Sequence, residues 1–125
     1  MSEGISQRFA ALLFFGDLAL MTILALKPIQ AMGDITHADK VLHFLAYLVL
    51  SGLAFLFAQH YRAFLGWCIA LAFYGAVIEG LQSFMPGRFM SFADFIANIS
   101  GIAVTILLVK IYLSKKTQNQ PSQTQ

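Results

Sequence analysis

Residues 79–101 read EGLQSFMPGRFMSFADFIANISG, and this stretch decides the fold because it sets polar residues between two strongly apolar segments. The chain on either side has the composition of membrane-spanning helix, whereas the stretch itself holds Glu79, Gln82, Arg88, Asp94 and Asn98. A charged side chain at the centre of a spanning helix costs roughly 2.5–3.5 kcal/mol on insertion scales. We therefore expect these residues to form either a site or a brace between helices.

The composition of the whole chain is that of a membrane protein. Of its 125 residues, 58% are hydrophobic and 11% are charged, whereas soluble domains are about 45–50% apolar and about 25% charged. The net charge of +2 and the lack of a basic stripe argue against a nucleic-acid partner. The single cysteine, Cys68, excludes a disulfide within the chain.

The apolar runs predict an all-α integral membrane bundle of four transmembrane helices. The first run, Phe9–Leu26, is long enough at about 1.5 Å per residue to cross a hydrocarbon core of roughly 30 Å. Its length and the presence of Asp17 favour a span over a cleaved signal peptide, and Lys27 before Pro28 ends it. The remaining spans are expected at about residues 39–58, 64–84 and 91–113.

Short signals mark the boundaries of these spans. Thr36–Asp39 and Ser91–Asp94 have the spacing of a variant capping box, with an acidic residue three positions after a hydroxyl residue. His60–Arg62 is expected to be a tight turn, and Met85–Arg88 has proline and glycine where a type II turn prefers them. The domains expected are a cytoplasmic N-terminus at 1–8, the membrane domain at 9–113 and a disordered cytoplasmic tail at 114–125.

The basic residues indicate the orientation. Five of them fall on the side of the termini and three on the other side: Arg8, Arg62, Lys110, Lys115 and Lys116 against Lys27, Lys40 and Arg88. Because cytoplasmic segments carry the excess of Lys and Arg, we expect both termini in the cytoplasm. The bias sharpens if Lys40 and Arg88 belong to a site.

Three of the predicted spans carry polar residues near the outer end. The stripes are Lys40, His43 and Tyr47; Glu79 and Gln82; and Asp94, Asn98 and Gly101. Residues spaced i, i+3, i+7 fall within about 60° of one helix face, so the economical packing turns these stripes toward one another. The small pairs Ala76–Gly80 and Ala97–Gly101 favour close helix approach there. We expect a polar pocket in the outer leaflet.

Most of these residues also have a purely structural alternative. Asp39 and Asp94 suit helix caps, Lys40 suits an interfacial side chain that reaches water, and Tyr47 suits an interfacial aromatic. Gln82 and Asn98 suit hydrogen bonds between helices.

The charged residues in the spans need partners. Glu79 lies about 7–8 Å inside its span, where a cation, either Arg88 or Lys40, would keep it charged. We expect Arg88 to form an ion pair with Glu79 or Asp94. Asp17 lies mid-span, away from the expected pocket, and has no evident partner.

These residues also carry a resemblance to a known family. The pattern is Asp39-Lys40, His43 and Tyr47, then Glu79-x-x-Gln82-x-Phe84-x-Pro86-x-Arg88-x-x-Ser91-x-x-Asp94-x-x-x-Asn98-x-x-Gly101. It resembles the signature of the VanZ-like membrane proteins over about residues 10–110. The resemblance implies a bacterial inner-membrane protein of a few helices, and the founding member of that family is linked to low-level resistance to the glycopeptide teicoplanin.

The chemistry open to the pocket is limited. His37, Asp39, His43 and Glu79 are of metal-ligating types, but no HExxH or similar spacing is present, so we expect neither a metal nor a cofactor. Ser83 and Ser91 lack an evident base. His43 and Glu79 could act as a general acid and base.

Three functions follow from this sequence. In the first, Lys40, His43 and Arg88 bind an anionic lipid head group or a glycopeptide carboxylate, because arginine forms paired hydrogen bonds with such groups. Tyr47, Glu79, Gln82, Asp94 and Asn98 then complete the binding site. In the second, the protein is an enzyme acting on a lipid-linked envelope precursor. In the third, it is a non-catalytic membrane scaffold. Membrane lipids are the expected partners, and the sequence indicates no oligomeric state.

Overall fold

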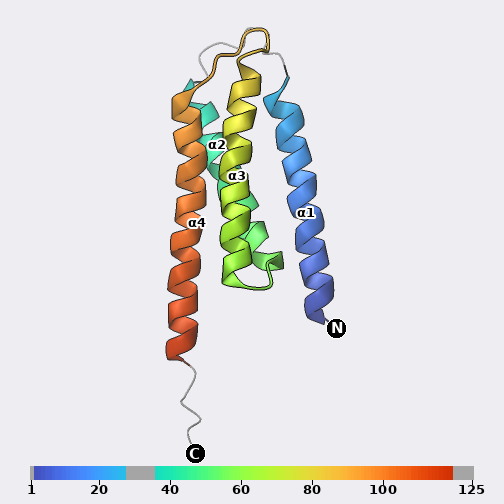
Figure 1. Cartoon of the computed structure of the whole chain (residues 1–125), viewed down its shortest axis with the longest axis vertical. Helices are drawn as coiled ribbons and strands as arrows, with labels where there is room; N and C mark the ends of the chain where they lie inside the picture. Colours follow the sequence, from blue (N-terminus) through green and yellow to red (C-terminus); the bar gives the residue numbers. More distant parts are fainter. Residues whose placement is uncertain (1, 28–35, 120–125) are drawn as a thin grey trace, which may run out of the picture.

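The computed structural model describes residues 2–27 and 36–119, and within these ranges the chain forms four α-helices that run alternately up and down (Figure 1). Side chains are described from 4 to 27 and from 38 to 119. The helices are α1 (Ser2–Ala25), α2 (Thr36–Phe57), α3 (Tyr61–Gln82) and α4 (Phe92–Gln118). Because the helices alternate, the two termini lie at one end of the bundle, and the α3–α4 connection lies at the other (Figure 1).

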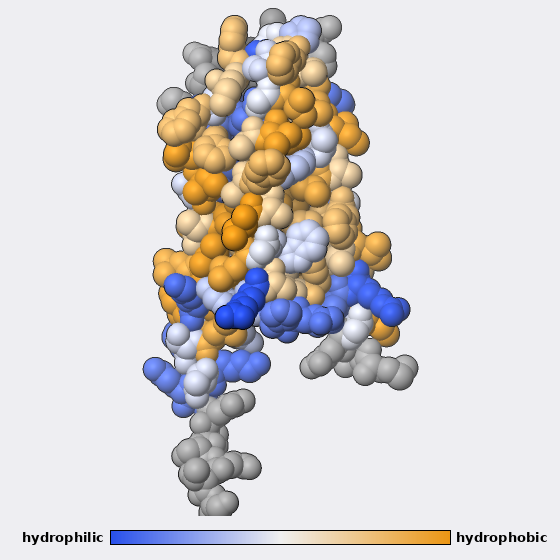
Figure 2. Space-filling model, in the orientation of Figure 1, coloured by the Kyte–Doolittle hydropathy of each residue, from blue (hydrophilic) through white to orange (hydrophobic). Residues whose placement is uncertain are grey.

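All four helices are long and apolar enough to cross a membrane, which confirms the predicted all-α bundle. Large hydrophobic side chains on the outside of the bundle, such as Leu12, Ile69, Phe73 and Leu107, are more than half exposed. Figure 2 shows that such side chains cover the middle of the visible face, while hydrophilic ones gather at the end that holds the termini. This distribution suits a bundle whose outer surface contacts lipid.

Four helix boundaries differ by three residues or more from the sequence-based prediction, and one of them is the start of α3, which lies at Tyr61 and not near residue 64. α1 begins at Ser2 and α2 at Thr36, so both start earlier than expected. α4 continues to Gln118, so the prediction of a disordered tail from residue 114 is wrong for its first residues. The polar residues there contain no helix breaker, and Lys115 and Lys116 in the last turn suit the negative end of the helix dipole. The expected tail at 120–125 and the Thr36 side chain lie outside the described residues.

The two described connections are short. In the α3–α4 connection the N–H of Arg88 donates to the carbonyl of Met85 at 3.1 Å, and Gly87 has φ of 78°. These are the features of the predicted type II turn, which needs glycine at its third position. The α2–α3 connection ends at His60, which directly precedes α3. Tyr61 and Arg62 are helical, so this turn lies slightly earlier than predicted.

The helices α2 and α4 approach each other closely at Gly101. A Cβ atom there would collide with the carbonyl oxygen of Phe44 and would lie 2.9 Å from the backbone nitrogen of Leu48. One turn further along α4, the hydroxyl of Ser51 donates to Thr105 Oγ1 at 2.7 Å, and both residues are buried. Small and hydroxyl side chains therefore join these helices, as is common where lipid removes the hydrophobic driving force between helices.

The other predicted small pair does not pack in this way. A Cβ atom at Gly80 would meet nothing within 4 Å, and Ala76 is exposed. The expectation of close packing at Ala76–Gly80 is therefore wrong. On α3 the close contact lies at Gly75 instead, on a different face of the same helix.

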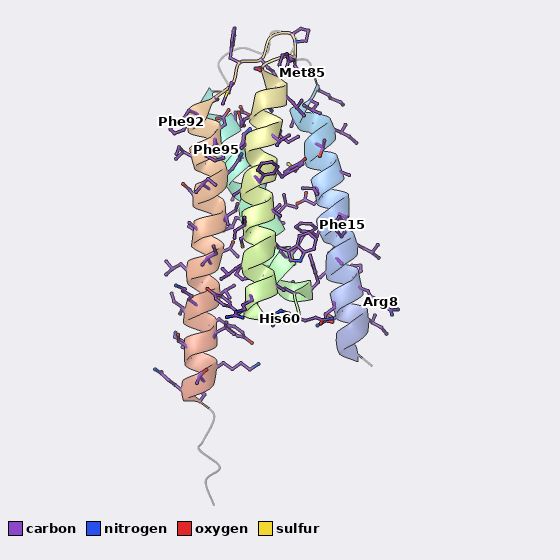
Figure 3. All side chains as sticks on the ribbon, in the orientation of Figure 1. Arg8, Phe15, His60, Met85, Phe92 and Phe95 are labelled. Atoms are coloured by element: carbon purple, nitrogen blue, oxygen red, sulfur yellow. The ribbon has the colours of Figure 1, made fainter. Side chains whose placement is uncertain are left out.

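Aromatic rings attach α1 to the rest of the bundle near the end that holds the termini. Phe14 is 1% exposed, and its ring makes edge contacts with Phe57 at 5.3 Å and Trp67 at 5.4 Å between centroids. The neighbouring Phe15 lies on the same stretch of α1, above Arg8 (Figure 3). Nearer the other end, the hydroxyls of Thr22 and Tyr74 hydrogen-bond to each other. α1 is thus fixed at two levels.

The two helical glycines provide a matched test of this packing. We expect Gly101→Ala to lower the stability of the bundle by about 1–3 kcal/mol, because the added methyl meets backbone that cannot move aside. Gly80→Ala adds the same methyl in open space, and it should be neutral or stabilising by up to about 1 kcal/mol because alanine is the better helix former. Thermal unfolding of both variants in detergent measures the difference. Equal effects of the two substitutions would contradict the close contact.

Candidate functional site

The start of α4 depends on a buried carboxylate from α3. The Ser91 hydroxyl accepts a hydrogen bond from the N–H of Asp94 at 3.2 Å, as the predicted capping box requires. The N–H of Ser91, however, donates to Glu79 Oε2 at 3.3 Å and not to the Asp94 carboxylate. Glu79 therefore completes a cap on a neighbouring helix, where the helix dipole also favours a negative charge.

This exchange of partners leaves the Asp94 carboxylate facing α2. The structure records two ion pairs between a basic residue of α2 and an acidic residue of α3 or α4. In the first, Lys40 Nζ lies 3.5 Å from Asp94 Oδ1. In the second, His43 Nδ1 lies 3.9 Å from Glu79 Oε1. Glu79 is 1% exposed and Asp94 is 6% exposed. The three predicted polar stripes therefore do converge.

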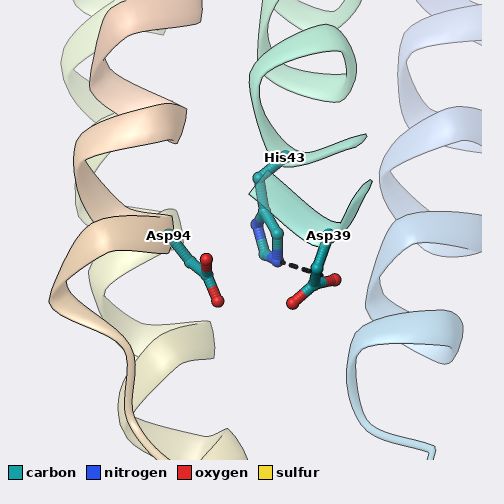
Figure 4. A group of neighbouring side chains, drawn as sticks. All are labelled: Asp39, His43 and Asp94. Carbon is teal, nitrogen blue, oxygen red and sulfur yellow. Dashed lines mark ion pairs between the residues drawn. The ribbon is translucent and has the colours of Figure 1, made fainter. Parts of the chain in front are cut away.

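His43 lies at the centre of this convergence. Its Nδ1 is 2.9 Å from the Asn98 side-chain oxygen, and its Nε2 is 3.8 Å from Asp39 Oδ1 (Figure 4). Because an amide oxygen can only accept, the hydrogen bond places a proton on Nδ1. Because the proton on Nδ1 is donated to Asn98, the Glu79 carboxylate lies beside the His43 ring as a neighbour. The hydrogen bond that Glu79 accepts comes from the N–H of Ser91.

The partner of Arg88 differs from the one predicted. Its Nε donates to the carbonyl of Lys27 at 2.9 Å, and one terminal nitrogen donates to the carbonyl of Leu24 at 3.3 Å. Within the described residues it forms no ion pair with Glu79 or Asp94, so that expectation is wrong. The physical reason is that the carbonyls of the last turn of α1 and of the residues just after it lie at the negative end of the helix dipole and attract cationic donors.

Gln82 also connects to α1. Its amide nitrogen donates to the carbonyl of Ala25 at 3.0 Å, and the residue is 3% exposed. Tyr47, expected as a possible interfacial aromatic, is instead buried at 5% exposure. A Cβ atom at Gly75 would lie 3.0 Å from the Tyr47 hydroxyl and 3.2 Å from the Asn98 amide nitrogen. The absence of a side chain at this position of α3 therefore makes room for two residues of the site.

A cavity of about 850 Å³ opens beside this cluster. Asp39, His43, Gln82, Arg88 and Asn98 lie at its polar end, and these residues come from all parts of the bundle except α1. The apolar part of the wall is formed by α1, α2 and α3 and consists of Met21, Leu24, Ala25, Leu42, Leu45, Ala46, Val49 and Ile78. The lining residues of α1, α2 and α3 fall within residues 17–25, 39–49 and 74–82, stretches of about ten residues each, so the cavity extends roughly 15 Å along the bundle.

The cavity corrects the prediction that Asp17 lies away from the pocket. Asp17 and Tyr74 both line the cavity wall. Sequence reasoning missed the contribution of α1 because its only ionisable residue in mid-span had no polar neighbour on the same helix. The signal that could have identified it is the general rule that ionisable residues inside a membrane face the bundle interior or a cavity.

Of the four residues considered for a metal, His37 has a side chain outside the described residues. Asp39 and His43 do lie together, but the third side chain beside them is Asp94 and not Glu79, which lies on the other side of the imidazole. Ser83 donates to the carbonyl of Gly80 at 2.6 Å and is exposed, so it takes part in the end of α3.

Comparison with known protein families matches residues 2–113 to the VanZ/LLP1 family. The match covers all four helices except the last turn of α4. Searches of curated proteins and of solved structures found no match. The predicted resemblance to VanZ-like proteins is confirmed.

The cap supplied by Glu79 can be tested by removing its charge. We expect Glu79→Gln to lower stability by roughly 1–3 kcal/mol, because the N–H of Ser91 loses a charged acceptor in a buried setting. Hydrogen exchange should accelerate at residues 91–94 more than in the rest of α4. Asp17→Asn, which makes the same chemical change far from Ser91, is the control. Unchanged exchange at 91–94 would show that Glu79 does not hold the start of α4.

Proposed function

This chain belongs to the VanZ/LLP1 family and is a multi-pass membrane protein, and from that premise we propose that its cavity binds a membrane lipid with an anionic head group. The observation that carries the proposal is the cavity itself, which joins a polar end near Arg88 to a mainly apolar wall on which Asp17, Tyr47 and Tyr74 are the polar members. Its length of roughly 15 Å is about half of a hydrocarbon core of roughly 30 Å, which suits the acyl or isoprenoid chain of a lipid in one leaflet.

Arg88 is the best-placed group to meet the head group. The guanidinium has five N–H donors, and its two recorded hydrogen bonds to Lys27 and Leu24 fix its position without using all of them. Arginine suits phosphate and carboxylate because its donors form a planar fork. His43 and Gln82 border the same end of the cavity and would contact the polar atoms next to the charge.

The remaining predicted ligand residues support this end from behind. Asn98 positions the His43 ring, Glu79 holds the start of α4, and Lys40 pairs with Asp94. Tyr47 lines the cavity wall. In this proposal they position the binding residues, and Lys40 adds positive charge near the opening. The same donors suit the carboxylate of a glycopeptide, which links the proposal to the trait of the family's founding member.

We further propose that the polar end of the cavity lies in the outer leaflet of a bacterial inner membrane. Arg8 and His60 lie near the end of the bundle that holds the termini (Figure 3), and the segments at that end also carry Arg62, Lys115 and Lys116. At the opposite end, Arg88 caps α1 and Lys40 pairs with Asp94, so these two cations have local roles. The basic residues without such a local role are therefore more numerous at the end that holds the termini, and this excess favours a cytoplasmic location for the termini.

Arg88→Ala tests the lipid proposal. We expect the wild-type protein, purified in mild detergent, to retain anionic lipid that native mass spectrometry detects, and the variant to retain at least about tenfold less, because a charge-assisted hydrogen bond contributes about 1.5–3 kcal/mol. Arg62→Ala removes the same charge from an exposed position at the opposite end of the bundle and should retain lipid normally. Equal retention by the two variants, or no lipid on the wild type, would refute the binding role.

Reporter fusions test the orientation. A reporter active only outside the cytoplasm should be active when inserted within 85–90 and inactive after residue 119. Charge placement in short connections sets topology, so adding basic residues to the 85–90 connection should weaken this result. Activity at the C-terminal position in the unmodified chain would overturn the proposed orientation.

A further inference from the structure

Three side chains of metal-ligating type meet where α2 and α4 begin. Asp39 and His43 come from the first turns of α2 and Asp94 from the first turn of α4, and one ligand atom of each lies within 4.8 Å of the others. Figure 4 shows the imidazole between the two carboxylates. We infer that these three residues bind a divalent transition-metal ion, with the chemical class of Zn²⁺ or Mn²⁺.

The orientation of His43 supports this inference. Asn98 accepts the proton of Nδ1 at 2.9 Å, so the lone pair of a neutral ring lies on Nε2, which faces Asp39 Oδ1 at 3.8 Å. A lone pair facing a carboxylate is unfavourable unless a proton or a cation lies between them. Metal-binding histidines characteristically donate their second ring N–H to a fixed acceptor, which is the arrangement that Asn98 gives here.

A second observation is independent of the ring. Asp94 Oδ1 and Glu79 Oε1 are buried oxygens that accept no hydrogen bond from any part of the chain that the structure describes. Asp94 is 6% exposed and is itself one of the three ligating residues. Buried polar atoms are rarely left without a hydrogen-bond partner. Asp94 Oδ1 has the Lys40 ammonium at 3.5 Å but accepts no hydrogen bond, and a bound metal ion would give this oxygen a direct ligand contact.

Charge leads to the same conclusion. The Asp39 and Glu79 carboxylates lie 3.8 Å and 3.9 Å from the two nitrogens of the His43 ring, and Asp94 lies 3.5 Å from the Lys40 ammonium, so three acidic side chains meet one lysine here. Lys40 offsets part of this charge, and its side chain is 40% exposed. Because a long exposed side chain can turn toward water, Lys40 would leave Asp94 when an ion binds. Lys40 and the ion therefore compete.

The ligand types select the metal. One imidazole nitrogen with two carboxylates suits Zn²⁺ and other transition metals, whereas Mg²⁺ prefers an all-oxygen octahedral shell. With metal–ligand distances of about 2.0–2.2 Å, neighbouring ligand atoms lie about 3.4 Å apart. Since these ligand atoms all lie within 4.8 Å of one another, no pair would have to approach by more than about 1.4 Å. The inference does not depend on the proposed lipid, because the ion needs only these three residues.

Calorimetric titration of Zn²⁺ and of Mn²⁺ tests this site. The protein is purified without a polyhistidine tag, treated with chelator and titrated in detergent with each metal alone. We expect saturable binding of a single ion, Zn²⁺ tighter than Mn²⁺, and no competition from Mg²⁺. Asp39→Asn and His43→Gln should each weaken binding about tenfold or more. Asp17→Asn removes a carboxylate from the same cavity outside this group and should leave the affinity unchanged.

Lys40→Met separates a metal site from a purely structural ion pair. If Lys40 competes with the ion, its removal should tighten Zn²⁺ binding several-fold, while the same variant should weaken the retention of anionic lipid. The unfolding temperature of each metal-free variant shows whether that variant folds. If His43→Gln does not fold, Asp39→Asn decides the outcome, because the Asp39 side chain is 45% exposed and its replacement should not disturb the bundle. No saturable binding by the wild type, equal affinity in Asp39→Asn, or weaker binding in Lys40→Met would overturn the inference.

Discussion

The hydrogen bond from the N–H of Ser91 to the Glu79 carboxylate is the interaction on which the rest of the site depends. It fixes the first turn of α4 to the last turns of α3 through a residue that is 1% exposed. In a membrane this is a sensible use of a carboxylate, because the first N–H groups of a helix have no partner in their own helix and lipid offers none. Without it, the start of α4 would need another acceptor at the same depth.

The same interaction determines what Asp94 can do. In a capping box within one helix, the acidic residue at the third position would accept from Ser91 itself. Because Glu79 takes that position, the Asp94 carboxylate turns toward Lys40 and His43 on α2. A cap shared between helices thus releases a buried carboxylate for a site. The close approach of α2 and α4 at Gly101 brings the two helices near enough for that carboxylate to reach its neighbours.

α1 has a different role from the other three helices. It contributes none of the polar side chains that meet around His43, yet it closes the cavity with apolar side chains and Asp17. Its attachment combines aromatic contacts around Phe14 with hydrogen bonds from Arg88 to the carbonyl of Leu24 and from Gln82 to the carbonyl of Ala25. An apolar wall facing a polar cluster is the physical basis for expecting an amphiphilic ligand. It also explains why the polar residues near α1 are donors, since the end of a helix presents carbonyl oxygens.

The sequence by itself determined the four spans, the type II turn at Met85–Arg88 and the common depth of the polar residues. Hydropathy and the helical repeat fix these features, because they depend on one helix at a time. The tertiary structure alone decided which partners meet: Arg88 with the end of α1, Glu79 with Ser91, and Asp17 with the cavity. The repeat shows which residues share a face of one helix, but it does not show how each helix is rotated against its neighbours. Long side chains such as arginine reach several acceptors of similar depth, so only the packed bundle selects among them.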